Sequence, residues 1–326
     1  MAEITLAEAV TQALAYEMAA DKNVVVLGED IGVNGGVFRT TVGLLEKFGP
    51  ERVIDTPLAE SMIAGVSIGM AVEGLRPVAE FQFMGFIYPA IDQITNHAAR
   101  MRNRTRGRLS CPIVFRAPYG GGIRAPEHHV ESLEVLFAHA PGLRVVVPSS
   151  PARAYGLLLA AIRDPDPVIF MEPMRIYRLV KQNVPDNGQA LPLDKCFVLR
   201  EGSDVTLVSW GASLHETLQA ADELEKQGIS AEVIDVATLK PLDMPTILHS
   251  LEKTGRCVII HEAPRTAGLA AEIAAQIAER ALTSLLAPVQ RVTGYDTVMP
   301  YLKMEKLYIP SVPKIINAVQ NVVEYA

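Results

Sequence analysis

The chain has 326 residues, of which 49% are hydrophobic and 21% are charged, and its formal net charge is −7. This composition excludes a disordered chain, and the length suits two domains better than one. The acidic balance and the scarcity of aromatic residues near the basic ones argue against nucleic-acid binding. No segment reaches the apolar length that would span a bilayer.

Basic residues are dispersed, except for alternate arginines from Arg100 to Arg108. Residues two apart do not share a helix face, so this segment predicts a solvated helix end and loop that could contact an acidic partner. The three cysteines Cys111, Cys196 and Cys257 lack metal-ligand spacing and are predicted to be buried as small hydrophobic residues. Their odd number and the lack of a signal-peptide pattern favour a reducing, cytoplasmic setting.

The first half of the chain alternates helical and strand patterns. In chain order the predicted elements are a helix over 6–20, a strand over 24–28, a short strand ending at 53–54, a helix after residue 60, a strand over 77–83, a helix over 88–102, strands over 112–116 and 144–148, a helix over 151–163 and a strand over 168–172. Apolar strands between helices imply a parallel sheet that helices cover on both faces.

Proline, asparagine and glycine interrupt this alternation between residues 179 and 202, which predicts an interdomain linker. A second alternation follows, with strands over 205–210, 231–236, 256–261 and 289–292 and helices over 214–227, 267–285 and 313–323. We therefore predict an α/β fold of two doubly wound domains, with a first domain over 1–180, a linker over 181–202 and a second domain over 203–326.

The segment around Glu60 is the strongest candidate for chemistry in the first domain. Pro57 fixes a turn, so Glu60 falls at a helix N-terminus, where the helix dipole favours negative charge. The helix has no further charge until Glu73, which predicts that most of its surface is buried, and Gly65 and Gly69 share a face that would let another backbone approach. A carboxylate in such a seam is partly desolvated and chemically useful. Ordinary tight packing is the alternative.

No nucleotide-binding signature accompanies this carboxylate. Gly32, Gly35 and Gly36 lack the Gly-x-Gly-x-x-Gly order, and nothing matches a P-loop. The sequence also lacks a Gly-Asp-Gly motif followed by an asparagine pair, the usual arrangement for holding a magnesium diphosphate. Either there is no phosphorylated cofactor, or a second polypeptide holds its other end.

A polar cluster at 120–129 follows the predicted strand 112–116, at the strand end where open α/β sheets bind ligands. Its three glycines, 120–122, either let a ligand approach closely or serve a mobile surface loop. No carboxylate or cysteine pattern makes a zinc site with His128 and His129, so a histidine acting as acid, base or charge stabiliser is preferred. A hydrolase is disfavoured, because no Gly-x-Ser-x-Gly sequence sits at a predicted strand-to-helix turn and Cys111 has apolar neighbours that would raise its pKa.

Several motifs occur in a consistent order along the chain. They are Asp55-Thr56-Pro57-Leu58-Ala59-Glu60, Gly74-Leu75-Arg76-Pro77, Phe81-Gln82-Phe83, His129 before Phe137-Ala138-His139-Ala140-Pro141-Gly142-Leu143, Ala161-Ile162-Arg163-Asp164, Glu201-Gly202-Ser203-Asp204-Val205 and Lys253-Thr254-Gly255-Arg256. Over essentially its whole length the chain resembles the beta subunit of the thiamine-diphosphate-dependent first component of 2-oxo acid dehydrogenase complexes. The resemblance implies a transketolase-like pyrimidine-binding domain followed by a C-terminal transketolase-type domain. It also implies an alpha subunit that carries the missing diphosphate motif and its magnesium.

The resemblance assigns roles to individual residues. Glu60 would hydrogen-bond the aminopyrimidine ring of thiamine diphosphate and promote its imino form. Leu58, Gln82 and Phe86 match positions that line the pyrimidine, although ordinary core packing is the alternative for them. His129 matches the active-site histidine that steadies the intermediate and assists acyl transfer.

Two further points follow from the resemblance. Many relatives have serine after the active-site histidine, whereas this chain has Val130, which puts the local hydrogen bonding in doubt. Some family members bind potassium, largely through backbone carbonyls, at positions matching Ile113, Ala161, Ile162, Asp164 and Asp166. A plain structural turn is the alternative for this segment.

The resemblance also implies partners and a reaction. We expect a heterotetramer of two alpha and two beta subunits that decarboxylates a small 2-oxo acid and passes the acyl group to lipoyl groups of a dihydrolipoyl acyltransferase core. Residues 83–88 and 129–134 are more similar to pyruvate-type members, whereas 291–297 is equally similar to the branched-chain type. Pyruvate is therefore favoured as the substrate. The alternatives are a branched-chain 2-oxo acid, acetoin, or a non-catalytic assembly subunit.

Overall fold

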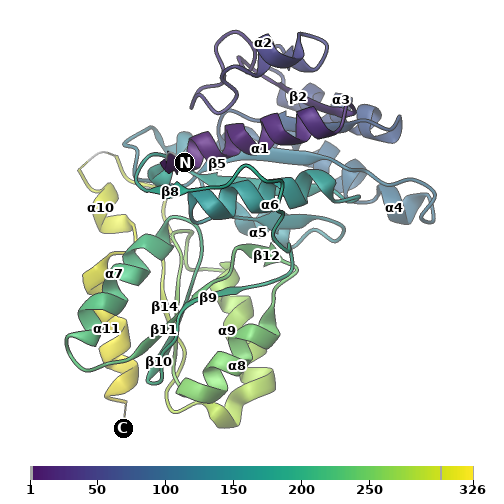
Figure 1. The fold of residues 1–326 in the computed structure, drawn as a ribbon. Helices are drawn as coiled ribbons and strands as arrows, with labels where there is room; N and C mark the ends of the chain where they lie inside the picture. Colours follow the sequence, from purple (N-terminus) through teal and green to yellow (C-terminus); the bar gives the residue numbers. More distant parts are fainter. Residues whose placement is uncertain (1–2, 302, 326) are drawn as a thin grey trace.

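The computed structural model of this protein describes residues 3–301 and 303–325. The described residues do not include residue 302, or residues 1, 2 and 326 at the outer ends of the two predicted domains. Two α/β units are stacked one on the other, the N-terminal unit at the top of Figure 1. Within the described residues the first contains a 7-stranded sheet and the second a 5-stranded sheet. The predicted α/β fold is confirmed.

The first sheet has the strand order β12-β6-β7-β5-β4-β2-β3. Its strands are β2 (Val24–Gly28), β3 (Val53–Asp55), β4 (Arg76–Glu80), β5 (Val114–Tyr119), β6 (Arg144–Val146), β7 (Val168–Pro173) and β12 (Thr238–Lys240). All neighbours pair in parallel except β12, which is antiparallel to β6. Alternate strand residues face different cores: Val114 packs on the side of α1 (Leu6–Ala20), and Phe115 packs on the side of α3 (Glu60–Val72).

Helices cover both faces of this sheet, as predicted. They are α1 (Leu6–Ala20), α2 (Leu44–Phe48), α3 (Glu60–Val72), α4 (Met101–Arg104), α5 (Glu134–Ala138) and α6 (Pro151–Arg163). α1 and α6 lie side by side (Figure 1). A capping box between Thr5 and Glu8 starts α1, and Ser150 caps α6 ahead of Pro151. Both helices have the predicted bounds.

The predicted helix over 88–102 is wrong as a single element. The chain forms 3-10 helices at Met84–Phe86 and Tyr88–Ala90, then a π-helix at Gln93–Ala98, and only then α4. The π-helix brings the Ala99 carbonyl so close to Gly142 (φ 91°) that no side chain would fit there. Tight packing against the turn before β6 therefore replaces regular helix.

The second sheet has the order β14-β13-β10-β11-β9. Its strands are β9 (Phe197–Arg200), β10 (Val205–Ser209), β11 (Ala231–Asp235), β13 (Cys257–Ile260) and β14 (Gln290–Val292). The helices are α7 (Ser213–Glu225), α8 (Met244–Thr254), α9 (Leu269–Ala281), α10 (Glu305–Tyr308) and α11 (Val312–Val323). α7 and α11 cover one face, and α8 and α9 the other (Figure 1). The sequence pattern missed α8, which Asp243 caps at its start and Gly255 ends in a left-handed conformation.

The predicted linker range contains two short strands. β8 (Lys181–Asn183) pairs with β1 (Glu3–Thr5), while β9 pairs with β11 in the second sheet. In the opposite direction β12, from the predicted second domain, joins the first sheet. Strand exchange thus ties the two units together, and the domain boundaries and the linker remain predictions.

Two predictions from composition have structural counterparts. Cys111, Cys196 and Cys257 are free and buried, as predicted. Burial raises the pKa of the Cys111 and Cys257 thiols to about 12, so neither is a ready thiolate nucleophile. Within residues 3–301 and 303–325, no helix combines the length and apolar character needed to cross a membrane.

Candidate active site

The carboxyl ends of β3, β2, β4 and β5 lie along one edge of the first sheet, because these strands are adjacent and parallel. Glu60 follows β3, Gln82 and Phe86 follow β4, and His129 follows β5. The fold therefore brings the predicted catalytic and cofactor-binding residues to a common edge, the usual ligand-binding edge of such sheets.

Glu60 is the first residue of α3, as predicted. Ala59 precedes it in a non-helical conformation and supplies no side-chain cap, so the helix N-terminus is open to the Glu60 carboxylate and to a ligand. The Glu60 side chain is half-buried.

A second carboxylate, which the sequence reasoning missed, lies beside it. Glu29 directly follows β2, and burial together with the nearby Asp30 and Glu60 carboxylates raises its pKa. The sequence feature that could have identified Glu29 is its position directly after a buried strand that ends in glycine. The Glu29 carboxyl group therefore holds its proton more tightly than a free glutamate does.

The surface of α3 corrects one expectation. Only one face of the helix is buried in this chain, while Met62 and Val66 are 38% and 43% exposed and Leu58, just before the helix, is 71% exposed. A Cβ added at Gly69 would meet nothing, and one at Gly65 would meet only the Gln93 side chain. The lack of charge on α3 thus reflects an exposed apolar stripe, and not complete burial within the chain.

The two adjacent histidines have different environments. The His129 ring packs edge-on against Phe83 and Phe86, with centroid distances of 4.6 and 5.0 Å, and its Nδ1 is buried without a hydrogen-bond partner among the described residues. His128 is exposed and lies 3.8 Å from the Glu127 carboxylate. Val130 is buried at 2% exposure in the apolar core, so its side chain supports the turn by packing.

A buried ionic network lies below this edge and was not predicted. Arg116 is fully buried and donates to Glu172 at 2.6 and 2.7 Å, to Glu80 and to Thr40. Burial raises the pKa of Glu80, and the Arg116 charge opposes that rise. Tyr177 donates to Glu172 at 2.6 Å.

An aromatic stack connects this network to the histidine. Phe38 packs between Tyr177 and Phe83, at centroid distances of 5.1 and 5.5 Å, and Phe83 in turn touches His129. The network and the stack together fix the floor of the candidate site.

Two of the residues that match the potassium position contact an arginine. Arg76 donates to the carbonyl oxygens of Ile162 and Asp164, at 2.9 and 3.3 Å. The carbonyls of Ile113 and Ala161 accept backbone N–H groups, and the Asp166 carboxylate pairs with Arg102 at 2.7 Å. No cluster of three or more His, Cys, Asp or Glu side chains in the described residues is arranged to hold a metal.

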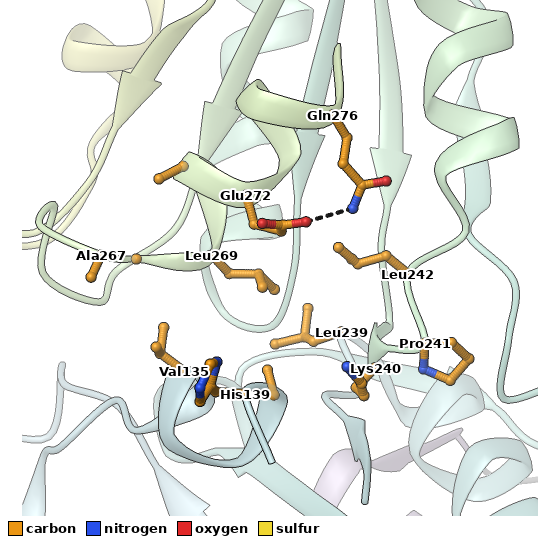
Figure 2. A pocket seen from close by; sticks show the side chains of 13 residues that line it. Val135, His139, Leu239, Lys240, Pro241, Leu242, Ala267, Leu269, Glu272 and Gln276 are labelled. Atoms are coloured by element: carbon orange, nitrogen blue, oxygen red, sulfur yellow. Dashed lines mark hydrogen bonds between the residues drawn. The ribbon is translucent and has the colours of Figure 1, made fainter. Parts of the chain in front are cut away.

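A separate pocket of about 680 Å³ lies at the seam between the two units (Figure 2). Val135 of α5 and His139 just after that helix line it, together with Lys240 at the end of β12. α9 contributes Glu272 and Gln276, which are hydrogen-bonded at 2.8 Å. Its lining includes none of the predicted catalytic or cofactor-binding residues. The volume of this pocket therefore does not identify the candidate site, because the candidate residues lie at the carboxyl edge of the first sheet.

Comparison with known proteins gives a consistent result. The family "Transketolase, pyrimidine binding domain" matches residues 2–180, and "Transketolase, C-terminal domain" matches residues 194–315. The chain is 50% identical over 325 residues to the pyruvate dehydrogenase E1 component subunit beta of Bacillus subtilis, covering 100% of both chains. It is also 50% identical over 315 residues to the protein of that name from Acholeplasma laidlawii, covering 97% of this chain and 96% of the relative.

A solved structure extends the match to the fold. It is described as "Split gene transketolase, inactive beta4 tetramer", and it superposes with a TM-score of 0.82 and 26% identity over 99% of both chains. The family matches, the full-length relatives and the fold agree with one another. The chain belongs to the family of pyruvate dehydrogenase E1 component beta subunits, which are built from transketolase-type pyrimidine-binding and C-terminal domains.

Proposed function

We propose that this chain is the beta subunit of a thiamine-diphosphate-dependent pyruvate dehydrogenase that transfers an acetyl group to lipoyl groups of an acyltransferase core. The observation that carries the proposal is the position of Glu60. It begins α3 at the ligand-binding edge, half-buried, beside the raised-pKa carboxyl group of Glu29 and next to an exposed apolar stripe.

The residues at this edge fit one end of the cofactor. Thiamine diphosphate, when bound, supplies a thiazolium ring that stabilises the carbanion left by decarboxylation. Glu60 would accept a hydrogen bond from the protonated pyrimidine ring and hold that proton in place. Leu58, Gln82 and Phe86 would line the pyrimidine. The His129 ring, whose buried Nδ1 has no hydrogen-bond partner among the described residues, would act on the acyl or lipoyl group.

The other end of the cofactor would be held by an alpha subunit. The chain lacks a magnesium diphosphate motif, and the stripe formed by Leu58, Met62 and Val66 leaves apolar area uncovered beside the site. We propose that an alpha subunit covers this stripe, holds the magnesium and completes a heterotetramer of two alpha and two beta chains in the cytoplasm. The buried free cysteines are compatible with that reducing compartment.

The proposal includes a potassium ion at this turn, which would share carbonyl oxygens with the Arg76 side chain. Each carbonyl oxygen of Ile113, Ala161, Ile162, Asp164 and Asp166 has two lone pairs, so oxygens already hydrogen-bonded can still contribute to an ion. The Asp164 and Asp166 carboxylates, which pair with Arg144 and Arg102, provide the negative charge of this turn.

A substrate comparison tests the proposal. The chain is co-expressed with a candidate alpha subunit, and thiamine-diphosphate-dependent turnover of pyruvate, 3-methyl-2-oxobutanoate and acetoin is measured side by side. We expect pyruvate to give the highest kcat/KM. A methylene in an apolar pocket changes selectivity by only about 1–3 kcal/mol, so the branched-chain acid should be turned over more slowly but measurably. Preference for either other compound would overturn the substrate assignment. An assembled but inactive tetramer would favour the assembly-subunit alternative.

A further inference from the structure

Side chains fill the space beside the glycine run at 120–122. Two of them come from the C-terminal unit, which contains the second sheet. A Cβ at Gly120, where φ is 83°, would lie 2.5 Å from the Glu262 carboxylate, and one at Gly121 would lie 2.5 Å from the Met299 methyl group. At Gly122, with φ 92°, a Cβ would collide with the Arg175 side chain. The glycines therefore serve an interdomain contact, and neither a ligand cradle nor a mobile loop is needed to explain them.

Two carboxylates of the C-terminal unit bind the backbone of this loop. The N–H of Gly121 donates to Glu262, and the N–H groups of Gly122 and Arg124 donate to Glu305 at 2.7 and 3.4 Å. Glu262 and Glu305 are only 5% and 4% exposed. Backbone N–H donors to a buried carboxylate form strong, directional hydrogen bonds, because the acceptor carries charge in a poorly solvated place.

The same contacts reach the far side of His129. Ser132 donates its hydroxyl to Glu262 at 3.4 Å, and the Gly120 N–H donates to the Glu131 carbonyl at 3.2 Å. The segment from Gly120 to Ser132 is thus closed on itself and fastened at both ends to one carboxylate. His129 lies within this closed segment, with its ring against Phe83.

We propose that Glu262 and Glu305 are positioning residues for His129, acting through the backbone of the 120–132 loop. The first unit supplies the aromatic surface on which the ring rests, and the C-terminal unit supplies the anchors that set where the loop begins and ends. This proposal rests on the proposed role of His129 in acyl transfer.

Replacement by glutamine tests the anchors in the assembled holoenzyme. Glu305→Gln and Glu262→Gln keep the side-chain shape but remove the charge that the N–H groups bind. Glu232→Gln is the matched control, since Glu232 is also a buried carboxylate of the C-terminal unit (2% exposed) that accepts a backbone N–H, from Gly202, far from the loop in the sequence. The first readout is hydrogen exchange of peptides covering 118–132, which does not depend on activity.

We expect exchange in this loop to rise about tenfold in the two anchor variants and to stay unchanged in the control. Acyl transfer to a lipoyl domain should fall about tenfold, while decarboxylation measured with an artificial electron acceptor and the KM for pyruvate stay within about twofold. Glu305→Gln combined with His129→Ala should be no worse in acyl transfer than His129→Ala alone. Glu305→Asp, which keeps the charge, should recover part of the loss.

Three results would overturn the proposal. Unchanged exchange in both anchor variants would mean that the carboxylates do not hold the loop. Faster exchange with normal acyl transfer would mean that they hold it without positioning His129. Normal acyl transfer in His129→Ala would contradict the proposed role of His129, on which the inference rests. If exchange in the anchor variants is still faster, the carboxylates hold the loop and only the proposed role of His129 fails. If glutamine prevents folding, Gly121→Ala disturbs the same loop against the flexible end of Met299, and the same outcomes apply.

Discussion

The glutamate side and the histidine side of the candidate site differ in how far this chain completes them. Around Glu60 the carboxylate is half-buried and apolar side chains face outward, with Leu58 71% exposed. Around His129 the ring is packed on Phe83 and Phe86, and two buried carboxylates fasten its loop. The comparison shows a site closed by the chain itself on one side and left open on the other, where a second polypeptide would have to supply the missing wall.

The largest expected effect is on the open side. Glu60→Gln should lower turnover of the assembled enzyme by about 10²–10⁴-fold, because the proton on the pyrimidine loses its acceptor. Glu73→Gln, the same change at the exposed far end of α3, is the matched control and should keep full activity. Steady-state turnover and gel filtration of the tetramer measure both. An assembled Glu60→Gln enzyme with normal turnover would remove Glu60 from the mechanism.

On the closed side, Arg116→Met should destabilise the fold by about 3–5 kcal/mol, because Glu80 and Glu172 would remain buried without their shared cation. Arg200→Met is the control, since Arg200 also meets two acids, Asp222 and Glu225, but at the surface. It should cost less than about 1 kcal/mol. Denaturant unfolding gives both values, and equal losses would show that burial of the network is unimportant.

A pH dependence should come from the seam behind the histidine loop. Burial raises the pKa of Glu134 to about 7, while its hydrogen bond from Trp210 opposes the rise and the Glu262 carboxylate adds to it. A carboxyl group with a raised folded-state pKa stabilises the fold fully below its unfolded pKa, near 4.5. That contribution, at most about 3 kcal/mol, is lost as the pH rises to about 7.

Trp210 is the only tryptophan and reports directly on this carboxyl group. Its emission in the isolated chain should titrate near pH 7, and Glu134→Gln should abolish the titration and flatten the stability change over the same range. A titration that persists in Glu134→Gln would assign it to another group.

A smaller effect is expected at the apolar stripe. Val66→Asp should weaken assembly with the alpha subunit by about 2 kcal/mol and leave the melting temperature of the isolated chain nearly unchanged. Val198→Asp on β9, at 41% exposure compared with 43% for Val66, is the matched control. Analytical ultracentrifugation measures the assembly. If Val198→Asp weakens it and Val66→Asp does not, the open side has been placed on the wrong surface.

The smallest effect concerns potassium. Exchange of sodium for an equal concentration of potassium should raise the melting temperature by about 2 °C, and Asp164→Asn should reduce that gain. Asp186→Asn, in the linker, is the control. Equal melting temperatures in the two salts would contradict potassium binding at this turn.

Local chemistry explains which features could be predicted. Thr5 and Glu8, Ser150 and Pro151, and Pro57 before Glu60 are start signals for helices, so α1, α6 and α3 begin where the sequence indicates. The order of parallel strands then carries Glu60, Gln82 and His129 to one edge. The helix starts depend on neighbours within a few residues along the chain, and the common edge follows from the alternation of strands and helices.

The missed features depend on distant residues. The π-helix at Gln93–Ala98 accommodates the turn at Gly142, and β12 joins a sheet whose other strands lie far earlier in the chain. Glu262 and Glu305 meet the glycine loop across more than 140 and 180 positions of sequence, respectively. The exposed face of α3 was mispredicted for a different reason. An uncharged helix surface predicts burial, but it does not indicate whether this chain or a partner chain covers that surface.

The shared-site account is tested most directly by measuring pyruvate decarboxylation, with thiamine diphosphate and magnesium, by the purified chain alone and after addition of the alpha subunit. The account predicts no turnover above background by the chain alone, and thiamine-diphosphate-dependent turnover once the alpha subunit covers the Leu58–Met62–Val66 stripe. Robust turnover by the chain alone would contradict it, because the Glu60 edge would then bind and activate the whole cofactor without a second wall.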